Sequence, residues 1–443
     1  SGSKEDVDKY RPVAIISNFA KVFQSILVKY MYSHVKQMIV SQQHGFMPGR
    51  STTTNLCNFS QDMSNLLDQQ LQVDVVYTDM TKAFDKVNHA LLINKLIEVG
   101  LCDKLIQLFQ SILVGQKQYV YYMYCKSYMY ECSSGVCQGS NLGPLLFTIF
   151  INGLIALLKK HCKVYAYADD IKFLKPIRNV TDCEALQNIG SIFYEWCNDN
   201  RLEVNGSKCK VMTYSRKIHN ILYNYKIHNQ ELERCNVYKD LGVVMDPSLS
   251  FVHHIEYVCN KAMRMLGFII RNTKDFTNMD CILMLYYAYV RSTLEYCSIV
   301  WSPHYISHIT LLEKVQRKFC KLVFYRKHGV YPVQGFSHHE LLNEFQLSPL
   351  SSRRDLSSVL FLFKILHNEI CDSSFLREIH FNVPRLEARN SRTFVLDLAR
   401  TNQHNNSPVY RMCRLYNSIQ YYVDIFAVSR SVFGTKAKLA LSG

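Results

Sequence analysis

The sequence predicts an α+β unit followed by a mostly helical second half. Short apolar strands alternate with amphipathic helices up to about residue 250, strand signals fade beyond Phe251, and no repeat of solenoid length is present. With 443 residues, of which 48% are hydrophobic, the chain can bury the cores of about two to three structural units.

Each predicted element follows from its local pattern. Helices are expected where apolar residues recur at helical spacing, and strands where short apolar runs end at turn residues. The uncharged run 142–158 opens with Gly143-Pro144 and contains Asn152 and Gly153, so we predict a buried helix rather than a membrane span. In chain order the predicted elements are helix 26–38, strand 73–79, helix 82–99, strand-like segment 119–132, helix 142–158, hairpin 164–174, helix 182–200, loop and strand 203–214, and helices 255–271, 281–300 and 309–325.

The basic charge lies mainly in the second half. Residues 1–200 hold 19 Lys+Arg against 17 Asp+Glu, whereas 201–443 hold 32 against 19, so 201–443 carries most of the net charge of +15. This asymmetry predicts a polyanionic partner held by the second half; a solvated basic surface is the alternative. The 16 cysteines include no Cys-x-x-Cys pair and no secretory signal is visible, so we expect reduced core thiols of an intracellular protein rather than a zinc knuckle.

Three aspartates stand at the ends of apolar strands. Asp79 closes the strand that begins at Val73, and Asp169-Asp170 form the turn of the hairpin 164–174. Carboxylates from two strand ends can chelate a pair of divalent cations for in-line nucleotidyl transfer, and such oxygen ligands suit Mg²⁺. Taken separately, an Asp-Asp turn and a helix-capping Asp account for the same residues without any metal.

Three further features surround the acids in the sequence. Phe84, expected at the start of the helix 82–99, can exclude a nucleotide 2′-hydroxyl or simply pack that helix on a sheet. The loop Gln138-Gly-Ser-Asn-Leu-Gly-Pro144 opens a helix, where an amide and backbone N–H groups can meet a base pair or phosphates; a plain turn is the alternative. Lys208 follows a tight turn and can donate a proton to leaving pyrophosphate, or remain a solvated lysine.

Six blocks occur in a fixed order: Arg11-Pro-Val-Ala-Ile, His44-Gly-Phe-Met-Pro-Gly-Arg50-Ser-Thr, Asp79-x5-Asp85, Gln138-Gly-Ser-x-Leu-Gly-Pro144, Tyr167-Ala-Asp-Asp170 and Tyr238-x2-Leu-Gly242. In this order and spacing the chain resembles the reverse transcriptase of non-LTR (LINE-type) retrotransposons. The later part resembles the jockey-like group of arthropods through Leu294-Glu-Tyr-x4-Trp301, Leu360-Phe-x-Phe-Lys-Ile365 and Ser407-Pro-x2-Arg411. The resemblance covers nearly the whole chain.

The resemblance implies an RNA-directed DNA polymerase that extends a primer 3′-hydroxyl on an RNA template with deoxynucleoside triphosphates. Two Mg²⁺ ions, for which Mn²⁺ can substitute, would be held by Asp79, Asp169 and Asp170. Lys208 would be the general acid. The other implied roles are triphosphate binding by Arg11, exclusion of ribonucleotides by Phe84, a nucleotide pocket lined by Gln138 and Gly139, template contact by Arg50, and a primer-end hairpin containing Leu241 and Gly242.

The fold implied is the right hand of polymerases, an α+β fold with an antiparallel-sheet palm, partial fingers and a helical thumb, plus a mostly helical C-terminal region. The corresponding ranges are 1–72 for the partial fingers, 73–250 for the palm with the active site and fingers insertions, 251–328 for the thumb and 329–443 for a region of unknown role. Basic thumb residues would bind duplex phosphates from shared helix faces, although a solvated face is the alternative. They are Lys261, Arg264, Arg271, Lys314, Arg317, Lys318 and Lys321.

The sequence departs from the family pattern at two places. Cys137 stands where the family has proline before Gln138, so proline does not fix φ in this loop. The chain opens a few residues before Arg11, and the basic residue expected ahead of that arginine is Lys4 or Lys9. The endonuclease domain that usually precedes such a polymerase is absent from this sequence. We therefore expect endonuclease and nucleic-acid-chaperone functions to be supplied by another protein.

The expected partners are an RNA template, a DNA primer or target DNA, and deoxynucleoside triphosphates, without a membrane. The expected location is a ribonucleoprotein in the nucleus and cytoplasm. Two other classes compete with this interpretation. One is a catalytically silent relic that binds RNA or DNA, and the other is an RNA-dependent RNA polymerase, against which Phe84 argues because ribonucleotides would clash with it.

Overall fold

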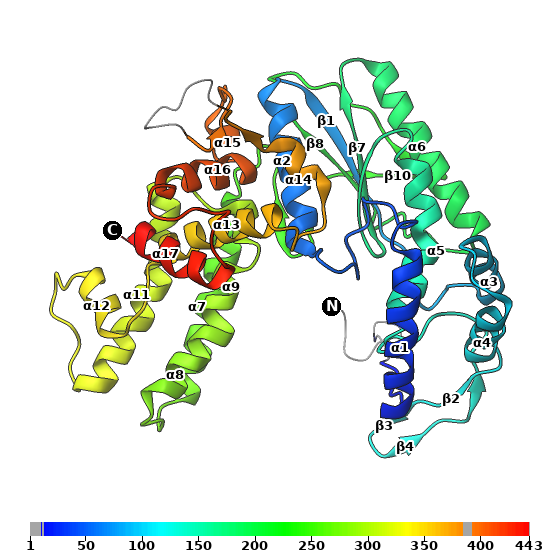
Figure 1. Ribbon diagram of the computed structural model, residues 1–443, viewed down its shortest axis with the longest axis horizontal. Coiled ribbons are helices and arrows are strands. Elements are labelled where there is room, and N and C mark those ends of the chain that lie inside the picture. The colour runs from blue at the N-terminus through cyan, green and yellow to red at the C-terminus, as the bar shows by residue number, and fades with distance from the viewer. Residues whose placement is uncertain (1–9, 11–12, 384–391, 443) are drawn as a thin grey trace. The chain divides into compact units, whose positions relative to one another are not determined.

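The computed structural model describes residues 10, 13–383 and 392–442, and the chain divides into two compact units (Figure 1). Unit 1 comprises 1–51, 72–213 and 218–235, and unit 2 comprises 52–71, 214–217 and 236–443. The predicted α+β class is confirmed, with the sheet in unit 1 and mostly helices in unit 2. The four ranges expected for fingers, palm, thumb and C-terminal region stay predictions.

Unit 1 is built on a five-stranded sheet in the order β11-β8-β1-β7-β6. Strand β1 pairs antiparallel with β7 from Gln72↔Ile177 to Tyr77↔Lys172, and β7 also pairs antiparallel with β6, whereas β11 and β8 are parallel. The strands of this sheet are β1 (Gln72–Tyr77), β6 (Lys163–Tyr167), β7 (Asp170–Ile177), β8 (Lys210–Tyr214) and β11 (Glu233–Arg234). The predicted strand and the predicted Asp-Asp hairpin are therefore confirmed as β1 and β6–β7.

Helices cover this sheet with apolar side chains. The uncharged helix α5 packs on β6 and on α6, and α6 packs on β7 (Figure 1). Pro144 lies in the first turn of α5, where a missing N–H costs nothing, and most of the helix is buried, as predicted. Within the described ranges, no helix is long and apolar enough to cross a membrane. The helices of unit 1 are α1 (Asn18–Val35), α3 (His89–Glu98), α4 (Asp103–Leu113), α5 (Gly143–Leu158) and α6 (Val180–Asp199).

The helix predicted over 82–99 is wrong in its first half. Residues before His89 form turns, and α3 begins only after Asn88, whose side chain accepts a hydrogen bond from Leu91 N–H. Phe84 therefore lies in a turn instead of at a helix start. The cause is non-local, because the carbonyls of Phe84 and Val87 accept from the N–H groups of Val136 and Gly135.

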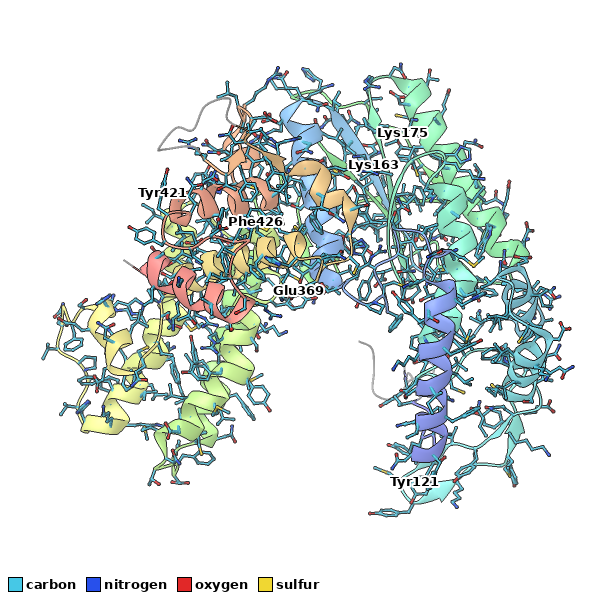
Figure 2. The ribbon with its side chains drawn as sticks, viewed as in Figure 1. Tyr121, Lys163, Lys175, Glu369, Tyr421 and Phe426 are labelled. Carbon is cyan, nitrogen blue, oxygen red and sulfur yellow. The ribbon has the colours of Figure 1, made fainter. Side chains whose placement is uncertain are left out.

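The tyrosine-rich segment forms two short, exposed strand pairs. Strands β2 (Lys117–Gln118) and β5 (Tyr130–Glu131) pair with each other, as do β3 (Tyr121–Tyr122) and β4 (Cys125–Lys126). Figure 2 shows Tyr121 in the second pair, and its side chain is exposed. A further short pair in unit 1 joins β9 (Lys226–Ile227) to β10 (Gln230–Glu231). The prediction of strand structure over 119–132 is thus correct, but the segment forms short separate strands instead of one continuous strand.

Unit 2 combines one hairpin with packed helices. The hairpin is β12 (Tyr238–Asp240) and β13 (Val243–Met245), and β14 (His380–Phe381) pairs with β15 (Phe394–Val395). The predicted helices 255–271 and 309–325 are confirmed as α7 and α11, but 281–300 is broken into α8, the π-helix η2, α9 and α10. The helices of unit 2 are α2 (Thr52–Asp68), α7 (Val252–Asn272), α8 (Met279–Leu285), η2 (Tyr286–Arg291), α9 (Ser292–Glu295), α10 (Ser298–Trp301), α11 (Ile306–His328), α12 (His338–Glu344), α13 (Leu350–Leu366), α14 (Ser373–Glu378), α15 (Asn402–Asn405), α16 (Pro408–Ile419) and α17 (Arg430–Ser442).

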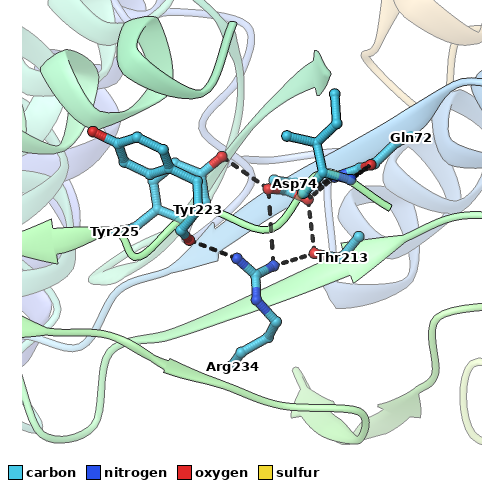
Figure 3. A network of polar contacts seen from close by, with 7 residues as sticks. Gln72, Asp74, Thr213, Tyr223, Tyr225 and Arg234 are labelled. Carbon is cyan, nitrogen blue, oxygen red and sulfur yellow. Dashed lines mark hydrogen bonds and ion pairs between the residues drawn. The ribbon is translucent and has the colours of Figure 1, made fainter. Parts of the chain in front are cut away.

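A buried polar network ties three strands of the unit 1 sheet together (Figure 3). Asp74 on β1 is fully buried and accepts hydrogen bonds from the hydroxyls of Thr213 and Tyr225, both at 2.8 Å. Arg234 on β11 lies 3.8 Å from the same carboxylate and donates to Thr213 on β8 and to the Tyr223 carbonyl. Burial, with Asp74 as the next cause, raises the pKa of Tyr225, so its hydroxyl remains a donor.

Candidate active site

The three predicted acids gather at one end of the unit 1 sheet. The β1–β7 ladder ends at Tyr77↔Lys172, and Thr78 N–H continues it by donating to the Ile171 carbonyl at 3.0 Å. Asp79 follows directly, at the end of the sheet where β7 begins with Asp170. Asp169 stands in the preceding β6–β7 turn. All three positions are partly or fully accessible, as carboxylates that meet a ligand must be.

A buried glutamine holds the turn that carries Asp169. Gln43 is fully buried, and its Oε1 accepts from the N–H groups of Ala168 at 2.9 Å and Gly45 at 2.8 Å. Ala168 has a φ of 57°, a left-handed conformation that costs free energy in a residue with a Cβ atom. A Cβ atom at Gly45 would collide with the Ala168 backbone nitrogen, so glycine permits this close approach. The surroundings of Asp169 are therefore set by residues that are distant in sequence.

Lys208 is positioned against Asp79 by the loop that precedes β8. Its Nζ lies 3.5 Å from Asp79 Oδ2. The loop is fixed to the β1 end by backbone bonds from Asn205 N–H to the Asp79 carbonyl at 2.9 Å and from Thr81 N–H to the Glu203 carbonyl at 2.8 Å. Cys209 Sγ accepts from Asp79 N–H at 3.3 Å, and burial raises the pKa of this thiol to about 11, so the thiol stays protonated.

Phe84 and the glycine-rich loop lie together in unit 1. Phe84 stacks on Phe147 of α5, with ring centroids 4.1 Å apart, and remains partly exposed. Gln138 Nε2 donates to Asp85 Oδ1 at 2.9 Å, which joins the loop to the residue after Phe84. Gly139 has a φ of 97° and is exposed, so its backbone is accessible at the loop surface. The structure thus brings Phe84, Gln138 and Gly139 to one region of unit 1.

Of the two arginines of unit 1 that were predicted to bind substrate or template, the structure describes one. Arg11 lies outside the described residues. Arg50 donates through Nη1 to the carbonyls of Ser41 and Gln43, at 2.8 and 2.6 Å, and so braces the loop that contains Gln43.

The predicted primer hairpin and basic residues belong to unit 2. Leu241 and Gly242 form the turn between β12 and β13, with φ values of 43° and 90°. On α7 and α11, Lys261, Arg264, Arg271, Lys314 and Lys318 are exposed, whereas Arg317 and Lys321 are half-buried. Arg317 donates to the Phe336 carbonyl at 3.2 Å, so it faces protein at this point.

The acids suit Mg²⁺ by the chemistry of their oxygens. Across the part of the chain that the structure describes, no three or more His, Cys, Asp or Glu side chains form a group that could hold a metal ion. Mg²⁺ does not require one, because it commonly binds one or two carboxylates together with water and substrate phosphates. Asp79, Asp169 and Asp170 are therefore the residues that would hold it. All 16 cysteines are free thiols, and seven of them are buried.

Acids at the end of antiparallel strands are the arrangement expected of a nucleic-acid polymerase. A family model described as "Reverse transcriptase (RNA-dependent DNA polymerase)" matches residues 3–270, more than half of the chain. The chain therefore belongs to the reverse transcriptase family.

Relatives confirm the resemblance to jockey-like elements. The chain is 26% identical over 330 residues to the RNA-directed DNA polymerase from mobile element jockey of Drosophila funebris, covering 72% of this chain and 36% of the relative. It is 24% identical over 323 residues to the probable RNA-directed DNA polymerase from transposon X-element of Drosophila melanogaster, covering 71% and 35%. The chain thus spans about a third of the length of these curated relatives. A solved structure, apo telomerase from Candida tropicalis, is 11% identical with a TM-score of 0.39, covering 81% of this chain and 55% of that chain.

Sequence reasoning missed several residues that support the site. Gln43 directly precedes the block that begins at His44. Its position two residues before Gly45, a residue that permits close backbone approach, was the signal that could have identified it. Asp74 gave a weaker signal, a lone carboxylate within an apolar strand. Neither residue is expected to touch a substrate, and both act by holding other parts of unit 1.

Proposed function

We propose that this chain is an RNA-directed DNA polymerase that extends a primer 3′-hydroxyl on an RNA template with deoxynucleoside triphosphates, as part of retrotransposition. The observation that carries the proposal is the strand register that sets Asp79 and the Asp169-Asp170 turn at the same end of the sheet, with Lys208 Nζ 3.5 Å from Asp79 Oδ2. Membership of the reverse transcriptase family and the named activity of the relatives support it.

Each residue of the proposed site would have a separate role in nucleotidyl transfer. Asp79 and Asp169 would bind two Mg²⁺ ions, with Asp170 shaping the site, and the bound ions would lower the pKa of the primer hydroxyl and stabilise charge on the phosphate. Lys208 would donate a proton to the leaving pyrophosphate. Phe84 would exclude the ribonucleotide 2′-hydroxyl, while Gln138 and Gly139 position the incoming nucleotide. Positioning and electrostatics would supply the rate, as in phosphoryl transfer generally.

The remaining predicted residues would bind nucleic acid. Arg11 would bind the triphosphate and Arg50 would follow the template. Leu241 and Gly242 would hold the primer end, and exposed Lys and Arg of α7 and α11 would contact duplex phosphates without reading sequence. The protein would act in a ribonucleoprotein of the nucleus and cytoplasm.

Primer extension on a heteropolymeric RNA template with Mg²⁺ and all four deoxynucleotides tests this function. The wild-type chain should synthesise DNA, whereas Asp169→Ala should lose synthesis by at least about a thousandfold and still bind the primer–template. Binding by both proteins with synthesis by neither would contradict the proposal and identify a nucleic-acid-binding relic. Loss of binding and synthesis together in Asp169→Ala would assign that residue a structural role.

A further inference from the structure

The segment Leu294-Glu-Tyr-x4-Trp301 has no role in the proposed chemistry, yet it contacts the β12–β13 hairpin. Tyr296 lies between α9 and α10, and its hydroxyl donates to the Leu241 carbonyl at 2.8 Å. The same hydroxyl lies 3.1 Å from Thr52 Oγ1, from which it can accept a second hydrogen bond. One side chain therefore fixes the turn of the hairpin to α2 within unit 2.

The tyrosine ring also restricts the next residue of the turn. A Cβ atom at Gly242 would lie 3.0 Å from Tyr296 Cε1, so the ring packs directly beneath that glycine. Leu241 and Gly242 are both left-handed, which matches a two-residue hairpin turn but is unfavourable for leucine. A tertiary contact to the Leu241 carbonyl is a physical means of holding that conformation.

A second chain of contacts from the same segment reaches β13. Trp301 is buried, and its indole N–H donates to the Tyr296 carbonyl at 2.8 Å. Its ring meets His254 edge-on, with centroids 4.9 Å apart, and His254 Nδ1 accepts from Val244 N–H at 3.1 Å. Burial lowers the pKa of His254 to about 4, so near neutral pH the ring keeps the neutral form that this acceptor role requires. The segment 294–301 thus supports both the Leu241–Gly242 turn and strand β13.

We infer that Tyr296 is a positioning residue that sets how the Leu241–Gly242 turn holds the primer end, with Trp301 and His254 supporting it. The inference rests on the proposed function, because Leu241 and Gly242 hold a primer only if the chain is a polymerase. It assigns a function to a segment whose residues otherwise indicate only a family resemblance. Tyr296 is not proposed to touch the reacting atoms.

Steady-state primer extension with Tyr296→Phe tests the inference. This variant keeps the ring beneath Gly242 and removes only the hydroxyl. The KM for primer–template should rise about threefold to tenfold, as expected for one lost hydrogen bond, while the KM for deoxynucleotides stays unchanged. Tyr289→Phe, which removes a hydroxyl from an exposed tyrosine of η2, is the matched control and should behave as wild type. An unchanged KM for primer–template, or an equal rise in both constants, would overturn the inference.

Hydrogen exchange separates this inference from the proposed function. Amides of 238–245 should exchange faster in Tyr296→Phe than in wild type or Tyr289→Phe. If the wild-type chain extends no primer, the polymerase proposal fails, and unchanged exchange in 238–245 would then overturn the positioning role on its own. Faster exchange together with weaker primer–template binding would in that case support the hold of Tyr296 on the turn, while the assignment of that turn to a primer end would fail with the polymerase proposal.

Discussion

Gln43 shows how one buried side chain can position a turn, here the turn that carries Asp169. Its Oε1 accepts from the N–H groups of Ala168 and Gly45, and these two bonds hold the left-handed residue before Asp169. Gln43→Met removes the acceptor at nearly equal volume, leaving two buried donors without it. We expect kcat for primer extension to fall about tenfold to a hundredfold, because small displacements of a reacting group are costly.

Gln42→Met is the matched control for this prediction, since Gln42 is the neighbouring glutamine and its Oε1 accepts from the Ser41 hydroxyl at the surface. The affinity for primer–template, measured by fluorescence anisotropy, should stay within about twofold of wild type in both variants. Equal kcat values for Gln43→Met and Gln42→Met would show that the turn does not depend on Gln43.

The stacked position of Phe84 makes a separate prediction about substrate choice. Its ring packs on Phe147 and remains partly exposed beside the Gln138 loop, so it can present an edge to a nucleotide sugar. Phe84→Val should raise kcat/KM for ribonucleotides at least about tenfold relative to deoxynucleotides, because a steric clash of this kind is worth more than one methylene. Competition between the two nucleotide classes measures the ratio. Unchanged exclusion of ribonucleotides would remove Phe84 from that role and leave it as a packing residue.

Among the elements, strands β1, β8 and β11 depend on the network around Asp74 for their pairing. Asp74→Ala removes the acceptor for Thr213 and Tyr225 and leaves Arg234 without its carboxylate. We expect the free energy of unfolding, measured with urea, to fall by about 3–5 kcal/mol, as when one partner of a buried ion pair is removed.

The control for this loss of stability is an ion pair at the surface that joins two of the same strands. Lys210 on β8 pairs with Glu233 on β11, where the Glu233 side chain is 71% exposed. Glu233→Gln should cost less than about 1 kcal/mol, because exposed pairs are screened by water. Similar losses in Asp74→Ala and Glu233→Gln would mean that the buried network does not stabilise the sheet.

Elements with strong local patterns were predictable from sequence, and those set by distant contacts were not. The acids of β1 and β6–β7, the buried helix α5 and the long helices α7 and α11 each have a local signal that the structure matches. The late start of α3 depends on bonds from Gly135 and Val136, some 50 residues away, to carbonyls before His89. The π-helix η2 likewise interrupts a continuous helical pattern, and periodicity does not distinguish these helix types. The role proposed for Tyr296 could not be predicted from sequence, because Leu241, which Tyr296 contacts, is far from it along the chain.

At the scale of the whole molecule, the charge asymmetry predicts salt-sensitive binding through unit 2. Lys314 and Lys318 lie one turn apart on the exposed face of α11. The double variant Lys314→Gln/Lys318→Gln should weaken primer–template binding and reduce the slope of log K against log salt by roughly one for each phosphate that is no longer neutralised. Lys159→Gln/Lys160→Gln, which removes two exposed lysines from the end of α5, should leave that slope unchanged. Equal slopes for both double variants would show that the duplex is bound elsewhere.

The path of the chain between the two units has a consequence for its synthesis. Helix α2 belongs to unit 2 and packs on α10, α15 and α16, but it is translated roughly 230 residues before the first of them. At about 5–20 residues per second, the ribosome needs roughly 10–50 s to produce α10. During that time the apolar face of α2, which includes Leu56, Phe59 and Met63, lacks its final packing partners. The nascent chain therefore exposes, for this time, apolar surface of the kind that chaperones bind.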